Sequence, residues 1–268
     1  MLVDAHCHPY DLARAFPEAE NERRHLGVLA AASACGEEEF SHNETLARNA
    51  RRDNAVSLLP CFAVHPQQFA VNKKQLSRNS GHLIMLDKLA SEGRIKAVGE
   101  CGFDLFNAAF RETETLQDDS FAAHLEIALR YDLPVILHVR RAMHKIFSVI
   151  NILSRCKAVI FHSWPGTSEE GRALLQRGVN AYFSFGNIIR LNHKHAIRSC
   201  ALLPVQRLLT ETDAPYQPPR GENYSRWSNL PLILEAASVI RNEAGAGIQA
   251  NELETQIENN FRAIFKCE

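Results

Sequence analysis

The sequence predicts a single (β/α)8 barrel of the TIM type that spans residues 1–268 and carries an additional C-terminal helix. Three features support this fold: eight short apolar runs, amphipathic stretches between them, and glycines where those stretches end. Near-continuous apolar strands are typical of a parallel sheet covered by helices on both faces. Barrels of this size commonly form one domain.

The eight apolar runs are the expected strands. In chain order they are LVDAHCH (2–8), GVLAAASA (27–34), VSLLPCFAV (56–64), IKAVGE (95–100), PVILH (134–138), AVIFH (158–162), NAYFSF (180–185) and QRLLTETD (206–213). Strands that alternate with helical patterns indicate βα units and therefore a parallel sheet.

The stretches between these runs have helical periodicity. Residues 119–132, for example, place Phe121, Leu125 and Leu129 on one helix face. Glycine commonly follows the last residue of a helix. Three glycines stand at such positions: Gly27, Gly93 and Gly178.

The C-terminal segment 251–268 repeats an apolar residue every fourth position, at Leu253, Ile257, Phe261 and Phe265. This spacing predicts a closing helix packed on the barrel. The alternative fold is an open doubly wound sheet. It lacks support because no GxGxxG motif follows the first strand.

Charge and cysteine usage exclude several classes of protein. The formal net charge is −1, whereas a protein that coats nucleic acid nonspecifically is usually basic. No run of 18 apolar residues and no positively charged leader occurs, so neither a membrane span nor a signal peptide is expected. Seven scattered cysteines without CxxC spacing predict free thiols and a cytoplasmic location.

The first strand carries a polar residue at every second position. Asp4, His6 and His8 alternate with Val3 and Cys7, and side chains of a strand alternate between its two faces. We therefore expect the two imidazoles and the carboxylate on one face, where they would make half a metal site. The simpler alternative is a strand end whose histidines only pack or hydrate.

Residues able to bind a metal end five of the eight expected strands. Active sites of such barrels form at the carboxyl ends of the strands, so these side chains should converge. We expect the following metal ligands: His6, His8, Glu100, His138, His162 and Asp213.

Six ligands exceed the needs of one catalytic ion, which typically takes three. Two divalent ions that share a carboxylate would use them all, and Glu100 is the expected bridge. His6, His8 and Asp213 come from adjacent strands of a closed barrel and would hold one ion. The remaining two histidines would hold the other. Imidazole-rich ligation favours zinc or manganese.

The ordered set of motifs resembles the TatD family of metal-dependent deoxyribonucleases, within the amidohydrolase-type barrels. The matching pieces cover essentially the whole chain: DAHCH near the start, VHP at 64–66, VGECGFD at 98–104, PVILHVRRA at 134–142, FHSWPG at 161–166 and TETDAPY at 210–216. The resemblance implies the same six metal ligands. It also implies a 3′-directed or endonucleolytic phosphodiesterase, supported by a divalent cation that can be magnesium.

This reading predicts that a metal-bridged hydroxide attacks the phosphorus of DNA or of another phosphodiester. Asp213 would orient the water and accept its proton, so Asp213 and Glu100 are predicted catalytic residues. His65 is predicted to contact a phosphate or the leaving oxygen, and it is the first candidate for the general acid. A hydrogen-bonded loop histidine is the alternative.

Other side chains are weaker candidates. Arg140 has the same strand parity as His138 and can point into the barrel mouth, where guanidinium suits phosphate; a surface arginine is the alternative. Glu211 would either orient a ligand or complete a core layer. Asp104 and Tyr216 are supported by the resemblance alone.

Two other functions remain open from the sequence. An amidohydrolase acting on a small ester, lactone or cyclic amide would share the HxH strand, but many such enzymes bridge their metals with a carboxylated lysine where this chain has Glu100. Lys96 lies four residues earlier, too deep in the strand to substitute. A noncatalytic interaction protein would be expected to lack a ligand, and none is missing. No membrane association and no stable protein partner are indicated.

Overall fold

The computed structural model describes residues 1–71 and 81–266. It contains the eight expected strands, which form one parallel sheet in the order β1 to β8. Their bounds are β1 Val3–Cys7, β2 Leu29–Ala32, β3 Leu58–Phe62, β4 Ala97–Asp104, β5 Val135–Arg140, β6 Val159–Phe161, β7 Ala181–Phe185 and β8 Leu208–Thr210. The prediction of a (β/α)8 barrel with an additional C-terminal helix is confirmed.

Hydrogen bonds between the first and last strand regions bring the two edges of the sheet together. The Thr210 hydroxyl donates to the Val3 carbonyl at 2.8 Å, and the Asp213 amide donates to the His6 carbonyl at 3.0 Å. The His8 amide in turn donates to the Ala214 carbonyl at 2.8 Å. The barrel therefore places the residues that follow β1 beside those that follow β8.

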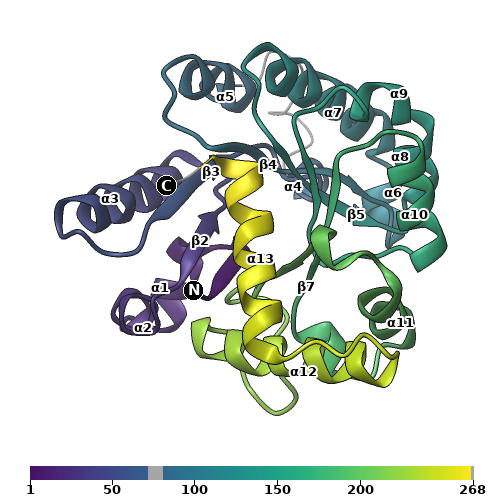
Figure 1. Cartoon of the computed structure of the whole chain (residues 1–268). Helices are drawn as coiled ribbons and strands as arrows, with labels where there is room; N and C mark the ends of the chain where they lie inside the picture. The colour runs from purple at the N-terminus through teal and green to yellow at the C-terminus, as the bar shows by residue number, and fades with distance from the viewer. Residues whose placement is uncertain (72–80, 267–268) are drawn as a thin grey trace.

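The helices surround the strands, as Figure 1 shows. Among the described residues, none of them is long and apolar enough to cross a membrane. The helices are α1 Pro9–Ala15, α2 Ala19–Leu26, α3 Glu37–Arg52, α4 Gln68–Val71, α5 Gly81–Ser91, α6 Ala108–Arg111, α7 Glu114–Arg130, α8 Met143–Ser148, α9 Ile150–Leu153, α10 Ser168–Gln176, η1 Asn187–Arg190, α11 Lys194–Leu202, η2 Val205–Arg207, η3 Trp227–Asn229, α12 Leu230–Glu243 and α13 Ala250–Phe265.

Helix α13 is the predicted closing helix, and it packs beside the start of the barrel. Its Asn260 side chain donates to the carbonyls of Val205 and Leu208, at 2.9 and 2.8 Å. The chain's amino group pairs with Glu258 at 2.7 Å, so α13 and the N-terminus lie together (Figure 1). The last two residues of the predicted segment, including Cys267, lie outside the described residues.

Strand β4 is longer than its apolar run predicted, because it continues past Glu100 to Asp104. Its register with β5 shifts at this point: Gly99 pairs with Ile136 and Cys101 pairs with Leu137. Glu100 is therefore an extra residue in β4, and such bulges re-aim side chains next to active sites.

The two glycines of the VGECG motif allow β4 and β5 to approach each other around this bulge. A Cβ atom on Gly99 would lie 2.5 Å from the Cβ of Ile136. A Cβ on Gly102, whose φ is +134°, would lie 2.2 Å from the backbone oxygen of His138. Because that oxygen belongs to the backbone of a packed strand, moving it away would cost stability.

Replacing Gly102 by alanine is expected to lower the free energy of unfolding by about 3 kcal/mol or more, since both the backbone angle and the clash oppose it. Denaturant unfolding measures this loss. Gly93→Ala is the matched control, because Gly93 has φ +66° but no neighbour within 4 Å of the added Cβ. Equal losses in the two variants would show that the clash contributes nothing.

A buried histidine outside the predicted site supports the loop after β3. The Nε2 atom of His124 accepts from the Val64 amide at 2.9 Å, and Nδ1 lies 2.6 Å from the Ser120 carbonyl. This pattern requires a neutral ring with its proton on Nδ1. Burial lowers the pKa of His124 from 6.5 to about 4.

Because His124 is buried in its neutral form, we expect the free energy of unfolding to fall in acid. The stabilising contribution of His124 is fully present above pH 6.5 and is lost as the pH falls toward 4, because only the unfolded chain accepts the proton in that range. The loss should approach about 3 kcal/mol. Urea unfolding at a series of pH values measures it, and His124→Gln should flatten the slope between pH 4 and 6.5. An unchanged slope in that variant would contradict the assignment.

Candidate metal centre

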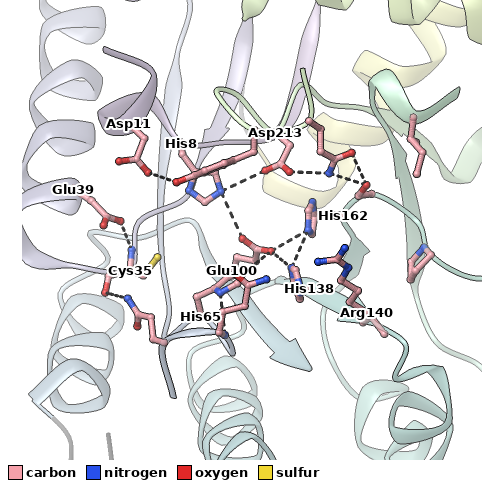
Figure 2. A pocket seen from close by; sticks show the side chains of 18 of the residues that line it. His8, Asp11, Cys35, Glu39, His65, Glu100, His138, Arg140, His162 and Asp213 are labelled. Atoms are coloured by element: carbon pink, nitrogen blue, oxygen red, sulfur yellow. Dashed lines mark hydrogen bonds and ion pairs between the residues drawn. The ribbon is translucent and has the colours of Figure 1, made fainter. Parts of the chain in front are cut away.

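The six predicted ligands lie together at the carboxyl-end side of the barrel, and Figure 2 shows all of them except His6. Three groups of side chains have ligand atoms that all lie within 4.8 Å of one another. The first group is His6, His8 and Glu100; the second is His6, His162 and Asp213; the third is His65, Glu100 and His138.

One half of the cluster comes from the ends of β1 and β8. The Nε2 atoms of His6 and His8 lie 3.1 Å apart. Asp213 Oδ1 lies 3.4 Å from the first and 3.5 Å from the second. Glu100 Oε2 reaches the same pair at 3.2 and 3.6 Å. Two imidazole nitrogens and two carboxylate oxygens thus face one small volume.

The other half of the cluster uses the second oxygen of the same glutamate. Glu100 Oε1 lies 2.7 Å from His138 Nδ1 and 2.9 Å from His162 Nε2. His65 Nε2 lies 3.3 Å from this oxygen. The carboxylate of Glu100 therefore lies between two groups of imidazoles, with one oxygen directed to each.

The buried carboxylates favour positive charge in the cluster. Burial would raise the pKa of Glu100, but His65, His162 and His6 hold that pKa well below its usual range. Burial would lower the pKa of His8, but Asp213 and Glu100 raise it to about 10. Such a donor set accepts either protons or cations, so divalent ions would bind here with release of protons. The residues present fit a metal centre.

Three of the imidazoles have a polar group next to the ring nitrogen that points away from the cluster. Ser33 Oγ lies 3.1 Å from Nδ1 of His6, and Asp104 Oδ2 lies 3.1 Å from Nε2 of His138. Glu211 Oε1 lies 3.5 Å from Nδ1 of His162. These contacts select which ring nitrogen faces the cluster, the usual arrangement for metal-binding histidines.

Asp213 stands in a loop, three residues after the end of β8, with φ +54°. Gln217 donates to its Oδ2 at 2.8 Å, so Oδ1 is left to face His6 and His8. The unusual backbone angle is typical of functional sites where the surrounding structure holds a residue in place.

The expectation that Asp4 belongs to the metal site is not met. Its carboxylate accepts hydrogen bonds from the amide and hydroxyl of Thr212, at 2.9 and 2.6 Å. A register shift between Asp4 and Cys7 interrupts the simple alternation of β1. Asp4 instead ties β1 to the segment that carries Asp213.

The two predicted substrate-binding residues line the same pocket, whose volume is about 700 Å³. The Gln67 amide donates to His65 Nδ1 at 3.2 Å, so a neutral His65 carries its proton on Nε2, toward Glu100. Arg140 is exposed at the pocket edge (Figure 2). Glu211 is buried, with Oε1 3.5 Å from Nδ1 of His162, a position compatible with both of its predicted roles.

Three further site residues were not predicted. Ser33 is the next-to-last residue of the apolar run 27–34, and its polar side chain within that run was the signal that could have identified it. Gln67 donates to Asp104 Oδ2 at 2.7 Å, and Gln217 holds Asp213. The two glutamines lie in loops, where no periodicity reports side-chain direction.

Comparisons of sequence agree with this geometry. The profile of the family described as TatD related DNase matches residues 3–266. A protein named 3′-5′ ssDNA/RNA exonuclease TatD from Pantoea sp. (strain At-9b) is 32% identical over 68% of this chain and 70% of its own length. A protein with the same name from Erwinia tasmaniensis is 33% identical over 67% of this chain and 70% of its own length.

Solved structures give the same result for the fold. YJJV, described as a TatD homolog from Escherichia coli k12, superposes with a TM-score of 0.83 and 26% identity, covering 100% of this chain and 98% of that one. A mutant organophosphorus hydrolase superposes with a TM-score of 0.63 and 14% identity, over 98% of this chain and 92% of that one. The second match indicates a shared barrel and nothing more.

Proposed function

Because this chain belongs to the TatD-related DNase family, we propose that its cluster holds two divalent ions and hydrolyses phosphodiester bonds of DNA. Zinc or manganese is favoured for the imidazole-rich ligands, and magnesium is able to serve. Single-stranded nucleic acid is the proposed substrate, by analogy with the names of the relatives.

One observation carries this proposal: each oxygen of Glu100 faces a different imidazole group. Oε2 lies 3.2 Å from His6 and Oε1 lies 2.9 Å from His162. A carboxylate that bridges two cations needs this arrangement. His6, His8 and Asp213 would hold one ion, and His138 and His162 would hold the other.

Three side chains at the cluster would then have separate roles in hydrolysis. Asp213 presents Oδ1 to the cluster and would accept the proton of the attacking water. His65 presents an N–H and would donate to the leaving oxygen or to a phosphate oxygen. Arg140 would neutralise phosphate charge at the pocket edge. When bound, the two cations would supply Lewis acidity and lower the pKa of the water.

The amidohydrolase alternative receives less support. Lys96 is exposed and precedes the first residue of β4, whereas Glu100 is buried within that strand. Lys96 therefore lies outside the cluster and does not line the pocket. The structural match between this chain and the organophosphorus hydrolase shows a shared fold only.

The cysteines are consistent with a proposed location in the reducing cytoplasm. All six cysteines within the described residues are free thiols. Cys7 Sγ and Cys101 Sγ face the carbonyls of Ala31 and Ile136, away from the cluster.

The proposal is tested by incubating the metal-loaded protein with end-labelled single-stranded DNA, a small phosphodiester and a carboxyl ester in parallel. We expect cleavage of the two phosphodiesters, and loss of cleavage after chelation. Asp213→Asn should retain the fold and lose cleavage. Hydrolysis of the ester alone would reverse the assignment in favour of an amidohydrolase.

A further inference from the structure

Exposed aromatic side chains occur only at the mouth of the barrel. All 14 Phe, five Tyr and two Trp residues lie in the described part of the chain, and the two most exposed of them are Phe106 at 38% and Tyr216 at 50%. Burial of aromatic rings stabilises a fold, so exposure confined to one functional face requires a separate explanation.

The two rings come from loops on opposite sides of the metal cluster. Phe106 follows β4 and Tyr216 follows β8, and these strands are four positions apart in an eight-stranded barrel. Figure 2 places Arg140, the neighbour of Phe106, beside His138 and His162, and Asp11, the partner of Tyr216, beside His8.

The Phe106 ring is combined with positive charge. The guanidinium carbon of Arg140 lies 3.6 Å from the ring centroid, and that of Arg141 lies 4.6 Å from it. Within the described residues no carboxylate pairs with Arg140, so its charge is available to a ligand. At this distance Arg140 covers one face of the ring, so a base would stack on the part of the ring that stays exposed, with the guanidinium close to its phosphate.

The Tyr216 ring is fixed in place but remains accessible. Its hydroxyl donates to Asp11 Oδ2 at 2.9 Å, and its ring stands edge-to-face with His8 at a centroid distance of 5.2 Å. It also lines the pocket. A held ring loses little freedom when a ligand stacks on it.

We infer that Phe106 and Tyr216 are stacking surfaces for two nucleobases, one on each side of the phosphodiester that the cluster cleaves. This inference rests on the proposed function, whose site it deepens. Bases reach such surfaces only when they are unpaired. The two rings therefore select single-stranded substrate, whatever the identity of the bases, because every base has a π-face.

Binding tests the inference directly. The probe is a fluorescently labelled oligothymidylate whose phosphorothioate linkages resist hydrolysis. The control ligand is an abasic oligomer with the same backbone. Anisotropy titration of the metal-loaded protein should show a Kd for the thymidylate raised about 5- to 150-fold by Phe106→Leu or Tyr216→Leu. Phe106→Tyr, which keeps the ring, should bind as wild type. Tyr216→Phe keeps the ring but loses its bond to Asp11, so it should raise the Kd much less than Tyr216→Leu does.

The abasic oligomer separates stacking from a structural role. Its Kd should be unchanged in both leucine variants, and Val239→Ala, which alters an exposed apolar residue of α12, should change neither Kd. Equal losses for both oligomers would overturn the inference, since the rings would then act only by positioning Arg140 or His8. The binding result stands even if the wild type cleaves no phosphodiester, an outcome that would instead reject the proposed function.

Discussion

Replacing Glu100 by glutamine is expected to halve the bound metal and to lower turnover at least about 10³-fold. The two halves of the cluster should respond differently. The His6 and His8 side keeps the carboxylate of Asp213, at 3.4 and 3.5 Å from their Nε2 atoms. The other side loses the one carboxylate proposed as its ligand and retains His138 and His162, so its ion should be lost first.

Metal content by mass spectrometry and cleavage of labelled DNA measure the two effects. Cys101→Ala is the matched control, because Cys101 is the next residue of β4 and its Sγ is directed toward the Ile136 carbonyl, 3.9 Å away. This control should keep both metal and turnover. A Glu100→Gln variant with full metal content and activity would show that the carboxylate bridges nothing.

The fold could be predicted because its signals are local and repeated. Each apolar run became a strand, and Gly27 ends α2 with φ +65°, the left-handed cap that glycine favours. Strand limits were less accurate, since β4 continues to Asp104 and β8 ends at Thr210. The bulge at Glu100 explains the first difference: an extra residue interrupts the pairing but does not end the strand.

The clustering of the six candidate ligands could be predicted because the carboxyl ends of parallel strands meet at one edge of the sheet, whatever the exact direction of each side chain. Details of direction could not be read from the sequence. Alternation placed Asp4 with His6, yet the bonds of Asp4 to Thr212 direct it between β1 and the β8 loop. Gln217 could not be predicted either, because its hydrogen bond to Asp213 depends on the path of a loop in which both residues have a positive φ.

Removing both imidazoles of the first strand, by His6→Ala with His8→Ala, is expected to abolish turnover and lower bound metal in a protein that stays folded. The two rings would supply two of the four ligands on their side of the cluster, so that only Asp213 and one oxygen of Glu100 remain. The fold should persist because β1 is held by Ala5 and Cys7 in the core and by backbone bonds to β2.

Circular dichroism, metal analysis and DNA cleavage decide this prediction, with Cys7→Ala as the control. Cys7 stands between the two histidines but faces the Ala31 carbonyl at 3.4 Å, so its loss should change neither metal nor turnover. Adding Glu100→Gln to the double variant should remove the remaining metal, because the ion held by His138 and His162 would then lose its proposed carboxylate ligand. Full activity in the double variant would refute the metal centre. Among the described residues, His162 is then the one imidazole that remains grouped with Asp213.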